Sequence, residues 1–281
     1  MRTTIGVPVY NGVQLIGECL ECLAGQSAAE FRVIISDNAS TDGTSDICQD
    51  YASRYDNFEH HRHAQTSDAF ANFDWLLRQA SDELFMWRAH DDLSSADYVE
   101  RLQAQFTDPT CRLAVAQVET LRVKPDGSVR RRLAHPPRKL SGGRGFGMVK
   151  DLMMRAHASW IYGLWHRQTL KDAFDSVGAD YGELWGWDHL TLLPVLFSQS
   201  VRADSQARFT QRIGATRGPS LDPTSAMRRR RQKAQRVLLQ QIEEADLGPI
   251  ERWTALVLAP LWLDKRIHSR SDLLKLSLRG R

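Results

Sequence analysis

The chain has 281 residues, of which 42% are hydrophobic and 25% charged, the composition of an ordinary soluble globular protein with one large domain or one domain plus an appendage. The first residues are already strand-like, and the longest apolar stretch, 253–263, is about half a membrane span. We therefore expect no signal peptide, no transmembrane helix and a cytoplasmic location. The net charge of +3 is uneven, because residues 226–281 hold 13 Lys and Arg against 6 Asp and Glu.

The first hundred residues alternate short apolar runs with helical patterns. Strands are predicted at 3–8, 32–36, 58–62 and 83–88, and helices at 13–25, 44–55, 68–80 and 95–106. This β-α repeat predicts an α/β fold with a mainly parallel sheet covered by helices on both faces. Ligands bind at the carboxyl ends of the strands in such sheets, which directs attention to the loops 9–12, 37–43 and 90–93.

The pattern is looser after residue 110. A hairpin is predicted at 113–122 and 128–133, a helix at 146–156, a strand at 159–166, and a loop at 178–186 that leads into a helix at 187–197. A last strand is predicted at 201–212, followed from residue 223 by two or three basic amphipathic helices.

An acid pair, Asp91-Asp92, follows the apolar strand 84–87. Two adjacent carboxylates repel each other, and the sequence shows no lysine or arginine placed to neutralise both. Oxygen ligands on a rigid strand end suit Mg²⁺ or Mn²⁺, with substrate phosphates completing the coordination shell. The alternative is a helix N-cap formed by Asp92 or Ser94.

The loop that reads SDNASTDGT, residues 36–44, is typical of a turn between a strand and a helix. A turn does not account for Asp37, whose carboxylate at a strand end is suited to accept a hydrogen bond from a base N–H or a ribose hydroxyl. The GxGxxG fingerprint is absent, which disfavours NAD. In the first loop, Tyr10 can pack on a base and Asn11 can start the turn.

Two aromatic segments lie downstream, SWIYGLWH at 159–166 and YGELWGWDH at 181–189. Flat rings beside carboxylates suit a sugar, although tryptophan is also heavily buried on average. Asp188, at the start of a predicted helix, is either a general base or an acid favoured by the helix dipole. His60, His61 and His63 are expected at the surface or sheet edge, and Cys19 and Cys22 as small buried thiols.

In this order, VPVYNG (7–12), SDNASTDGT (36–44), AHDD (89–92) and WGWD (185–188) resemble the family 2 glycosyltransferases of the GT-A fold over about residues 3–200. The resemblance implies that Pro8, Tyr10, Asn11, Asp37 and Asp91 bind the nucleotide. It also implies that Asp91 and Asp92 hold a divalent cation, Mg²⁺ or Mn²⁺, and that Asp188 is the catalytic base.

Two positions depart from the family pattern. Ala89 stands where the first acid of D-x-D is expected, and Trp187 replaces the glutamate before the base. The second departure affects the acceptor side. The residues expected to bind the acceptor are Trp160, Tyr162, Glu183, Trp185, Trp187 and His189.

The implied reaction is inverting transfer of a sugar from a UDP-, GDP- or dTDP-linked donor to a saccharide or lipid-linked saccharide, in the synthesis of a surface polysaccharide. Residues 1–110 would form the nucleotide-sugar half, 111–222 the acceptor half and 223–281 a basic helical region. A sugar nucleotidyltransferase would need a Gly-rich loop with a lysine or arginine after the first strand, which is absent. A degenerate sugar-binding or scaffold protein is the non-catalytic alternative.

The basic tail has two interpretations. Arg228–Arg231, Lys233 and Arg236 lie near the apolar stretch 255–263, which predicts peripheral contact with an anionic inner membrane leaflet. The alternative is a helical appendage that packs on the body or forms a homodimer contact. The basic run has no interleaved aromatic residues, so nucleic acid is not an expected partner.

Overall fold

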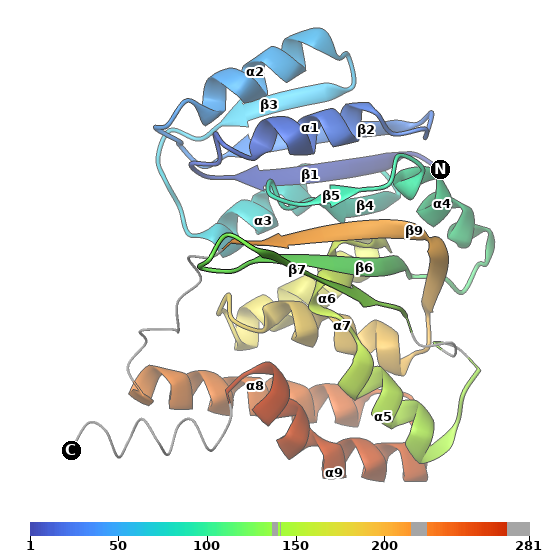
Figure 1. The fold of residues 1–281 in the computed structure, drawn as a ribbon. Coiled ribbons are helices and arrows are strands. Elements are labelled where there is room, and N and C mark those ends of the chain that lie inside the picture. The colour runs from blue at the N-terminus through green and yellow to red at the C-terminus, as the bar shows by residue number, and fades with distance from the viewer. Residues whose placement is uncertain (137–139, 141, 215–223, 269–281) are drawn as a thin grey trace. The chain divides into compact units, whose positions relative to one another are not determined.

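The computed structural model describes residues 1–136, 140, 142–214 and 224–268 (Figure 1). Its first four long strands are β1 (Thr3–Val9), β2 (Phe31–Asp37), β3 (Phe58–Arg62) and β4 (Leu84–Trp87). They pair in parallel in the order β3-β2-β1-β4, as the sequence predicts. The helices between them are α1 (Ile16–Ala24), α2 (Thr44–Arg54) and α3 (Ala69–Gln79).

These elements follow from local sequence. All residues of β1 and β4 are buried, and parallel strands buried on both faces read as continuous apolar runs. Helix α1 buries one apolar stripe, Ile16, Cys19, Leu20 and Leu23. Helix α3 begins after Asp68, whose carboxylate accepts a hydrogen bond from the backbone N–H of Ala71 at 2.8 Å.

The second part of the sheet is antiparallel, so the expectation of a mainly parallel sheet holds only for its first part. Strand β4 pairs with β8 (Leu164–His166), and β8 pairs with β6 (Leu113–Val123), which forms the predicted hairpin with β7 (Val129–Ala134). Strand β9 (Val201–Ile213) neighbours β6 and pairs with the short β5 (Leu93–Ser94). Helix α4 (Tyr98–Ala104) follows β5.

Two elements differ from the prediction. The strand predicted at 159–166 is a 3-10 turn, Ala158–Tyr162, followed by β8, because the Gly163 N–H bonds back to the Trp160 carbonyl. Helix α6 (Arg167–Asp180) was not predicted and takes up part of the expected loop 178–186. Its signal was the spacing of the buried residues Leu170, Phe174 and Val177 within a polar segment.

The chain packs as two compact units. The first consists of residues 1–136, 159–171 and 202–217, and therefore holds the sheet. The second consists of residues 137–158, 172–201 and 218–281. These units follow packing and differ from the functional halves predicted from the sequence, whose boundaries at 110 and 222 stay a prediction.

The second unit contains α5 (Gly145–Arg155), α7 (Trp187–Phe197), α8 (Thr224–Glu244) and α9 (Pro249–Arg266). Helices α8 and α9 thus belong to a unit with α5 and α7 and do not form a separate appendage. Residues 223 and 269–281 of the predicted tail lie outside the described residues. Within the described part of the chain, no helix is both long and apolar enough to cross a bilayer.

The four cysteines are free thiols. Cys19 is buried, and its thiol donates to the Ala89 carbonyl at 3.5 Å. Burial raises the pKa of Cys19 to about 12. A buried, protonated thiol is a packing residue, so Cys19 matches the expectation of a small buried thiol, whereas Cys22 is only half-buried.

Candidate functional site

Three loops meet at one edge of the sheet in the first unit. Val9, the last residue of β1, is in register with Asp37, the last residue of β2. Strand β4 also runs parallel to β1, with Trp87 beside Gly6. Because the carboxyl ends of parallel strands face the same edge, the loops after β1, β2 and β4 lie together, as the sequence predicts.

Asp37 is fully buried, and only one of its two carboxylate oxygens accepts a hydrogen bond. Its Oδ1 accepts a hydrogen bond from the Ser40 N–H at 2.9 Å, whereas Oδ2 is buried without a hydrogen-bond partner. The Arg62 Nε lies 3.6 Å from this oxygen and the His60 Nε2 3.9 Å from it. An unpartnered buried carboxylate oxygen is rare in folded proteins and favours a ligand donor such as a base N–H.

His60 matches the expectation of a sheet-edge residue but is not at the surface. It lies on the edge strand β3, but its side chain is only 5% exposed and its Nε2 has no hydrogen-bond partner. Burial lowers the pKa of His60, although the nearby Asp37 charge opposes this shift. A neutral imidazole beside Asp37 adds a second polar group at this position. His61 is exposed as expected and stacks on Trp75, with ring centroids 4.5 Å apart.

The first loop is held by the second. The side-chain Oδ1 of Asn11 accepts from the Thr41 N–H at 2.9 Å, and its backbone N–H donates to Ser40 at 2.9 Å. Gly12 lets the first loop lie close to His90, because a Cβ at this position would be 2.5 Å from the His90 ring. Asn11 therefore braces two loops, and its role toward a nucleotide stays a prediction.

Pro8 and Tyr10 flank the end of β1 differently. Pro8 is buried within the strand, and the Tyr10 side chain is exposed at the strand end. An exposed aromatic ring directly after Val9, which is in register with Asp37, provides a flat surface on which a base can stack.

The acid pair after β4 has two different environments. Asp91 is half-buried and Asp92 is buried. The Asp92 Oδ1 accepts a hydrogen bond from the Arg212 N–H at 2.8 Å. Burial and, next, the Asp91 charge raise the pKa of Asp92 to about 7. Without a cation, ionisation of Asp92 beside Asp91 is therefore unfavourable.

Arg212, at the end of β9, was missed by the sequence analysis, which found no basic residue placed to neutralise the acids. Its Nε donates to the Asp91 carbonyl, and its Nη1 donates to Glu18 at 2.6 Å. Its Nη2 is buried and has no hydrogen-bond partner. The free donor of this guanidinium can bind an anionic group, and only the three-dimensional pairing of β5 with β9 brings it to the site.

A second arginine, Arg88, lies between β4 and the acid pair. It is fully buried, donates to the Ser94 hydroxyl at 3.1 Å, and lies over the rings of Tyr98 and Phe209 at 5.0 and 5.1 Å. Its positive charge lowers the pKa of Asp92, but burial and Asp91 outweigh this effect. Arg88 therefore packs as a cation between aromatic rings.

The residues after β4 fit a cation bound together with phosphates. In the part of the chain that the structure describes, no three His, Cys, Asp or Glu side chains cluster as a metal site. Mg²⁺ and Mn²⁺ bind nucleotides with one or two carboxylates plus substrate phosphates and water. Asp91 and Asp92 meet that requirement.

Asp188 lies in the second unit, in the first turn of α7 after Gly186 and Trp187. Its Oδ1 is 2.7 Å from the His189 N–H, which donates to it. Burial lowers the pKa of Arg266, and the Asp188 charge partly opposes this shift, so a cation lies near the carboxylate. The acid is half-buried at the positive end of a helix, a position that favours negatively charged side chains.

The predicted acceptor residues of the second unit have separate surroundings. Trp185 is 51% exposed, donates from Nε1 to the Ile267 carbonyl at 2.8 Å and stacks on His268. Glu183 forms ion pairs with Arg230 at 3.3 Å and Lys233 at 3.5 Å. Of these residues, Trp185 offers an exposed ring whose orientation is fixed.

The other predicted acceptor residues are less accessible. Trp187 is buried and packs edge-on against Phe174. Burial and, next, the Arg266 charge lower the pKa of His189 well below its usual range, so its imidazole is neutral. In the first unit, Trp160 is buried in the core, and Tyr162 stacks on Phe209 at 5.5 Å. Burial of Trp160 and Trp187 favours packing roles for both.

Replacing Gly186 with alanine is expected to lower the free energy of unfolding by about 1–3 kcal/mol, because Gly186 has a φ of +85° and a Cβ would lie 2.4 Å from Ile267 Cδ1. Urea unfolding measures the change. Gly147, inside α5, is the matched control: no atom lies within 4 Å of its Cβ position, so Gly147→Ala should be neutral or stabilising by about 0.5–1 kcal/mol. Equal losses in both variants would contradict this role of Gly186.

Residues 4–162, more than half of the chain, match the family model described as Glycosyl transferase family 2. The chain belongs to glycosyl transferase family 2. The sequence resemblance is thereby confirmed. Poly(ribitol-phosphate) beta-glucosyltransferase from Bacillus spizizenii is 39% identical over 59 residues, which are 20% of this chain and 9% of that protein.

Solved structures show the same fold. S. aureus TarS 1-349 in complex with UDP-GlcNAc has a TM-score of 0.65 at 18% identity, over 94% of this chain and 71% of that one. The mannosyltransferase PcManGT from Pyrobaculum calidifontis, in complex with GDP-Man and Mn²⁺, has a TM-score of 0.59 at 17% identity, over 100% of this chain and 76% of that one. The fold is that of the GT-A glycosyltransferases. The matches cover only 9–37% of the length of the curated relatives.

Proposed function

We propose that this family 2 glycosyltransferase transfers a sugar from a nucleoside-diphosphate donor to a hydroxyl acceptor, with inversion at the anomeric carbon and with a divalent cation. One observation carries the proposal. The buried Asp37, with one carboxylate oxygen that has no hydrogen-bond partner, lies at the same sheet edge as the acid pair Asp91-Asp92. The first suits a nucleoside and the second a metal-bound diphosphate, the two parts of one donor.

On the donor side, the proposal assigns a role to each residue. The Asp37 Oδ2 accepts a hydrogen bond from the base or ribose, and Tyr10 stacks on the base. Pro8 and Asn11 shape the loop around it. The Arg212 Nη2, buried without a partner, donates to a diphosphate oxygen. This contact places positive charge where negative charge develops as the diphosphate leaves.

Asp91 and Asp92 would hold the cation, Mg²⁺ or Mn²⁺. When bound, it would supply Lewis-acid stabilisation of the departing diphosphate. The relative in complex with GDP-Man and Mn²⁺ supports this assignment. Ala89 has no side-chain oxygen to offer as a ligand, so the phosphates of the donor would have to supply the remaining ligands.

Asp188 acts as the general base. Its carboxylate takes the proton of the acceptor hydroxyl as the oxygen attacks the anomeric carbon from the face opposite the diphosphate. The bond from that carbon to the diphosphate oxygen breaks, and the nucleoside diphosphate leaves with the electron pair. Arg266 places a positive charge close to Asp188.

The acceptor is a saccharide or a lipid-linked saccharide of a surface glycan, bound on the cytoplasmic side of the membrane. Trp185, with its exposed and oriented ring, is the best-placed of the predicted acceptor residues of the second unit to stack on a sugar. Among the curated relatives, one is named for a glucosyl transfer to poly(ribitol-phosphate), which supports a glycan acceptor.

Two other functions fit less well. A sugar nucleotidyltransferase needs a Gly-rich loop with a basic residue after the first strand, and the loop after β1 is instead braced by Asn11 and Ser40. A degenerate sugar-binding protein would not need a buried acid, Asp92, next to a second acid and beside Arg212. Both alternatives predict that no sugar is transferred to an acceptor hydroxyl.

Nucleotide binding tests the donor site directly. We expect one of UDP, GDP and dTDP, with Mn²⁺, to raise the melting temperature by about 4–8 °C at a concentration about 100-fold above its Kd. Asp37→Asn keeps the Oδ1 acceptor for Ser40 but loses the free carboxylate oxygen, so the shift should fall to near zero. The exposed Asp46 is the matched control, and Asp46→Asn should respond like the wild type. Absence of a shift with every nucleotide would refute the donor site.

A further inference from the structure

Helix α9 exposes an unusual amount of apolar surface for a helix of a globular unit. Trp253 is 63% exposed, and four more large apolar side chains of the same helix are exposed. We call this set the α9 face. It consists of Ile250, Trp253, Leu256, Val257 and Leu261.

The opposite side of α9 is already the core of the second unit. It buries Ala255, Leu258 and Trp262, and α9 packs against α5 and α8. The helix is therefore apolar on two sides, and the described part of the chain covers only one of them. A helix that is apolar all round normally has partners on all sides.

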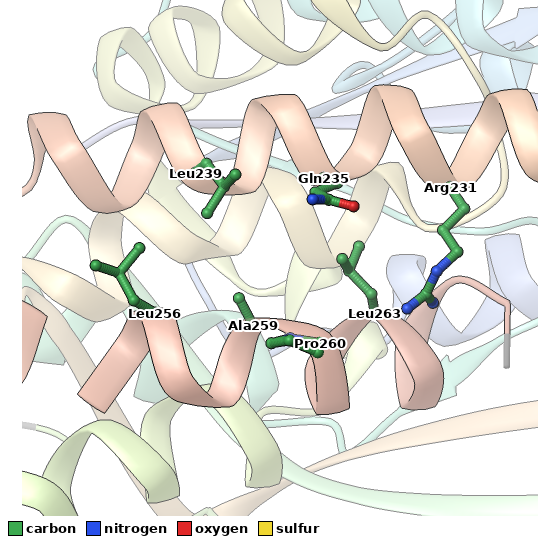
Figure 2. A pocket seen from close by; sticks show the side chains of 7 residues that line it. All are labelled: Arg231, Gln235, Leu239, Leu256, Ala259, Pro260 and Leu263. Carbon is green, nitrogen blue, oxygen red and sulfur yellow. The ribbon is translucent and has the colours of Figure 1, made fainter. Parts of the chain in front are cut away.

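A groove between α8 and α9 widens the α9 face (Figure 2). Its volume is about 410 Å³, and Leu239 of α8 faces Leu256 of α9 across it. Arg231 closes the end of the groove near Leu263 and is paired with Asp264 at 2.8 Å. The remaining lining is Gln235, Ala259 and Pro260, so apolar surface continues from one helix to the other.

Exposed basic side chains outnumber exposed acidic ones on α9 and on the two helices that pack against it. Over α5, α8, α9 and the α8–α9 connection, six described basic side chains are exposed against three acidic ones, Glu243, Glu244 and Asp246, which group at the connection. The basic ones are Lys150, Arg155, Arg228, Arg229, Arg236 and Lys265.

This basic set differs from the one that the sequence suggested. Arg230 and Lys233 pair with Glu183, and Arg231 pairs with Asp264. Half of the basic run of α8 therefore stabilises the second unit. The exposed charges instead come from three helices, α5, α8 and α9.

We propose that the α9 face docks on an anionic lipid bilayer, with α9 lying in the interface. The charge of the surface is complementary to anionic headgroups, whereas two copies meeting through this face would bring like charges together. An exposed tryptophan suits the interface between headgroups and acyl chains, and no described helix can cross the bilayer. The inference goes beyond the proposed transfer reaction and does not depend on it.

Vesicle co-sedimentation of the full chain tests the proposal. Vesicles of phosphatidylcholine with about one third phosphatidylglycerol should bind the protein at least about tenfold better than phosphatidylcholine alone, and high salt should weaken binding. Trp253→Ser with Val257→Ser should reduce binding to anionic vesicles by about tenfold or more. Arg228→Gln with Arg229→Gln and Arg236→Gln should remove the preference for anionic vesicles.

Matched controls come from the first unit. Val129 is 52% exposed on β7, so Val129→Ser should bind vesicles like the wild type. Arg54 and Arg78 are exposed, and Arg54→Gln with Arg78→Gln should keep the preference for anionic lipid. Equal binding to both vesicle types, or equal losses in control and test variants, would overturn the proposal. If light scattering instead shows a dimer, and Trp253→Ser dissociates it, then a second copy of the chain covers the α9 face.

Discussion

Replacing Asp188 with asparagine is expected to lower the rate of sugar transfer by about 10²–10⁴-fold, because an amide cannot take the proton of the acceptor hydroxyl. The side chain keeps its shape and its Oδ1, which accepts from the His189 N–H. Nucleotide binding, measured by the thermal shift with Mn²⁺, should therefore stay within about twofold of the wild type. Initial rates with a panel of nucleotide sugars and a saccharide acceptor measure the transfer.

Asp180 provides the control for this variant. It is an exposed acid at the end of α6 in the same unit, and Asp180→Asn removes the same charge without touching α7. Its transfer rate should match that of the wild type. If Asp188→Asn retained full activity, the acid would be only a favourable first-turn residue of the helix. If it lost nucleotide binding as well, the base would be misassigned.

The parallel half of the fold was predictable because its signals are local. Buried parallel strands are continuous apolar runs, and the helices between them each bury one stripe. The antiparallel half was less predictable, since β8 has only three residues and β5 has two. Such short strands are defined by their pairing partners, which no local pattern reveals.

The candidate site shows the same division. Asp37 and the acid pair stood out because each is a charge at the end of an apolar strand. Arg212 and His60 could not be found this way, because their importance depends on which side chain they approach in space. The aromatic segments misled in a different way: tryptophan suits both a sugar and a core, and only burial separates Trp185 from Trp160 and Trp187.

Asp92→Asn is expected to stabilise the ligand-free protein while weakening Mn²⁺-dependent nucleotide binding. The amide keeps the Oδ1 acceptor for the Arg212 N–H but removes a buried charge beside Asp91. The pKa of Asp92 is raised from 3.8 to about 7, and a shift of about three units corresponds to an upper limit of about 4 kcal/mol at and above pH 7. Because asparagine also loses hydration on burial, we expect a gain of about 1–3 kcal/mol.

The sign of the pH dependence follows from the two pKa values. Above pH 7 the folded protein must hold the ionised acid, so the difference between Asp92→Asn and the wild type is largest there. Between pH 7 and about 4 the folded form is protonated while the unfolded form still ionises, and the difference shrinks as the pH falls. Urea unfolding in EDTA at several pH values measures this trend.

Asp108 is the opposite case and provides the control. Hydrogen bonds from Thr110 and Arg202 lower the pKa of Asp108 to about 2, so its charge stabilises the fold above pH 4, and Asp108→Asn should destabilise it. A residue kept only as a helix cap would behave like Asp108. If Asp92→Asn instead gains stability in EDTA and loses the Mn²⁺-dependent nucleotide shift, the acid is retained at a cost in stability because it serves the donor site. Destabilisation with an unchanged nucleotide shift would make Asp92 a structural acid and leave Asp91 as the remaining candidate for the cation.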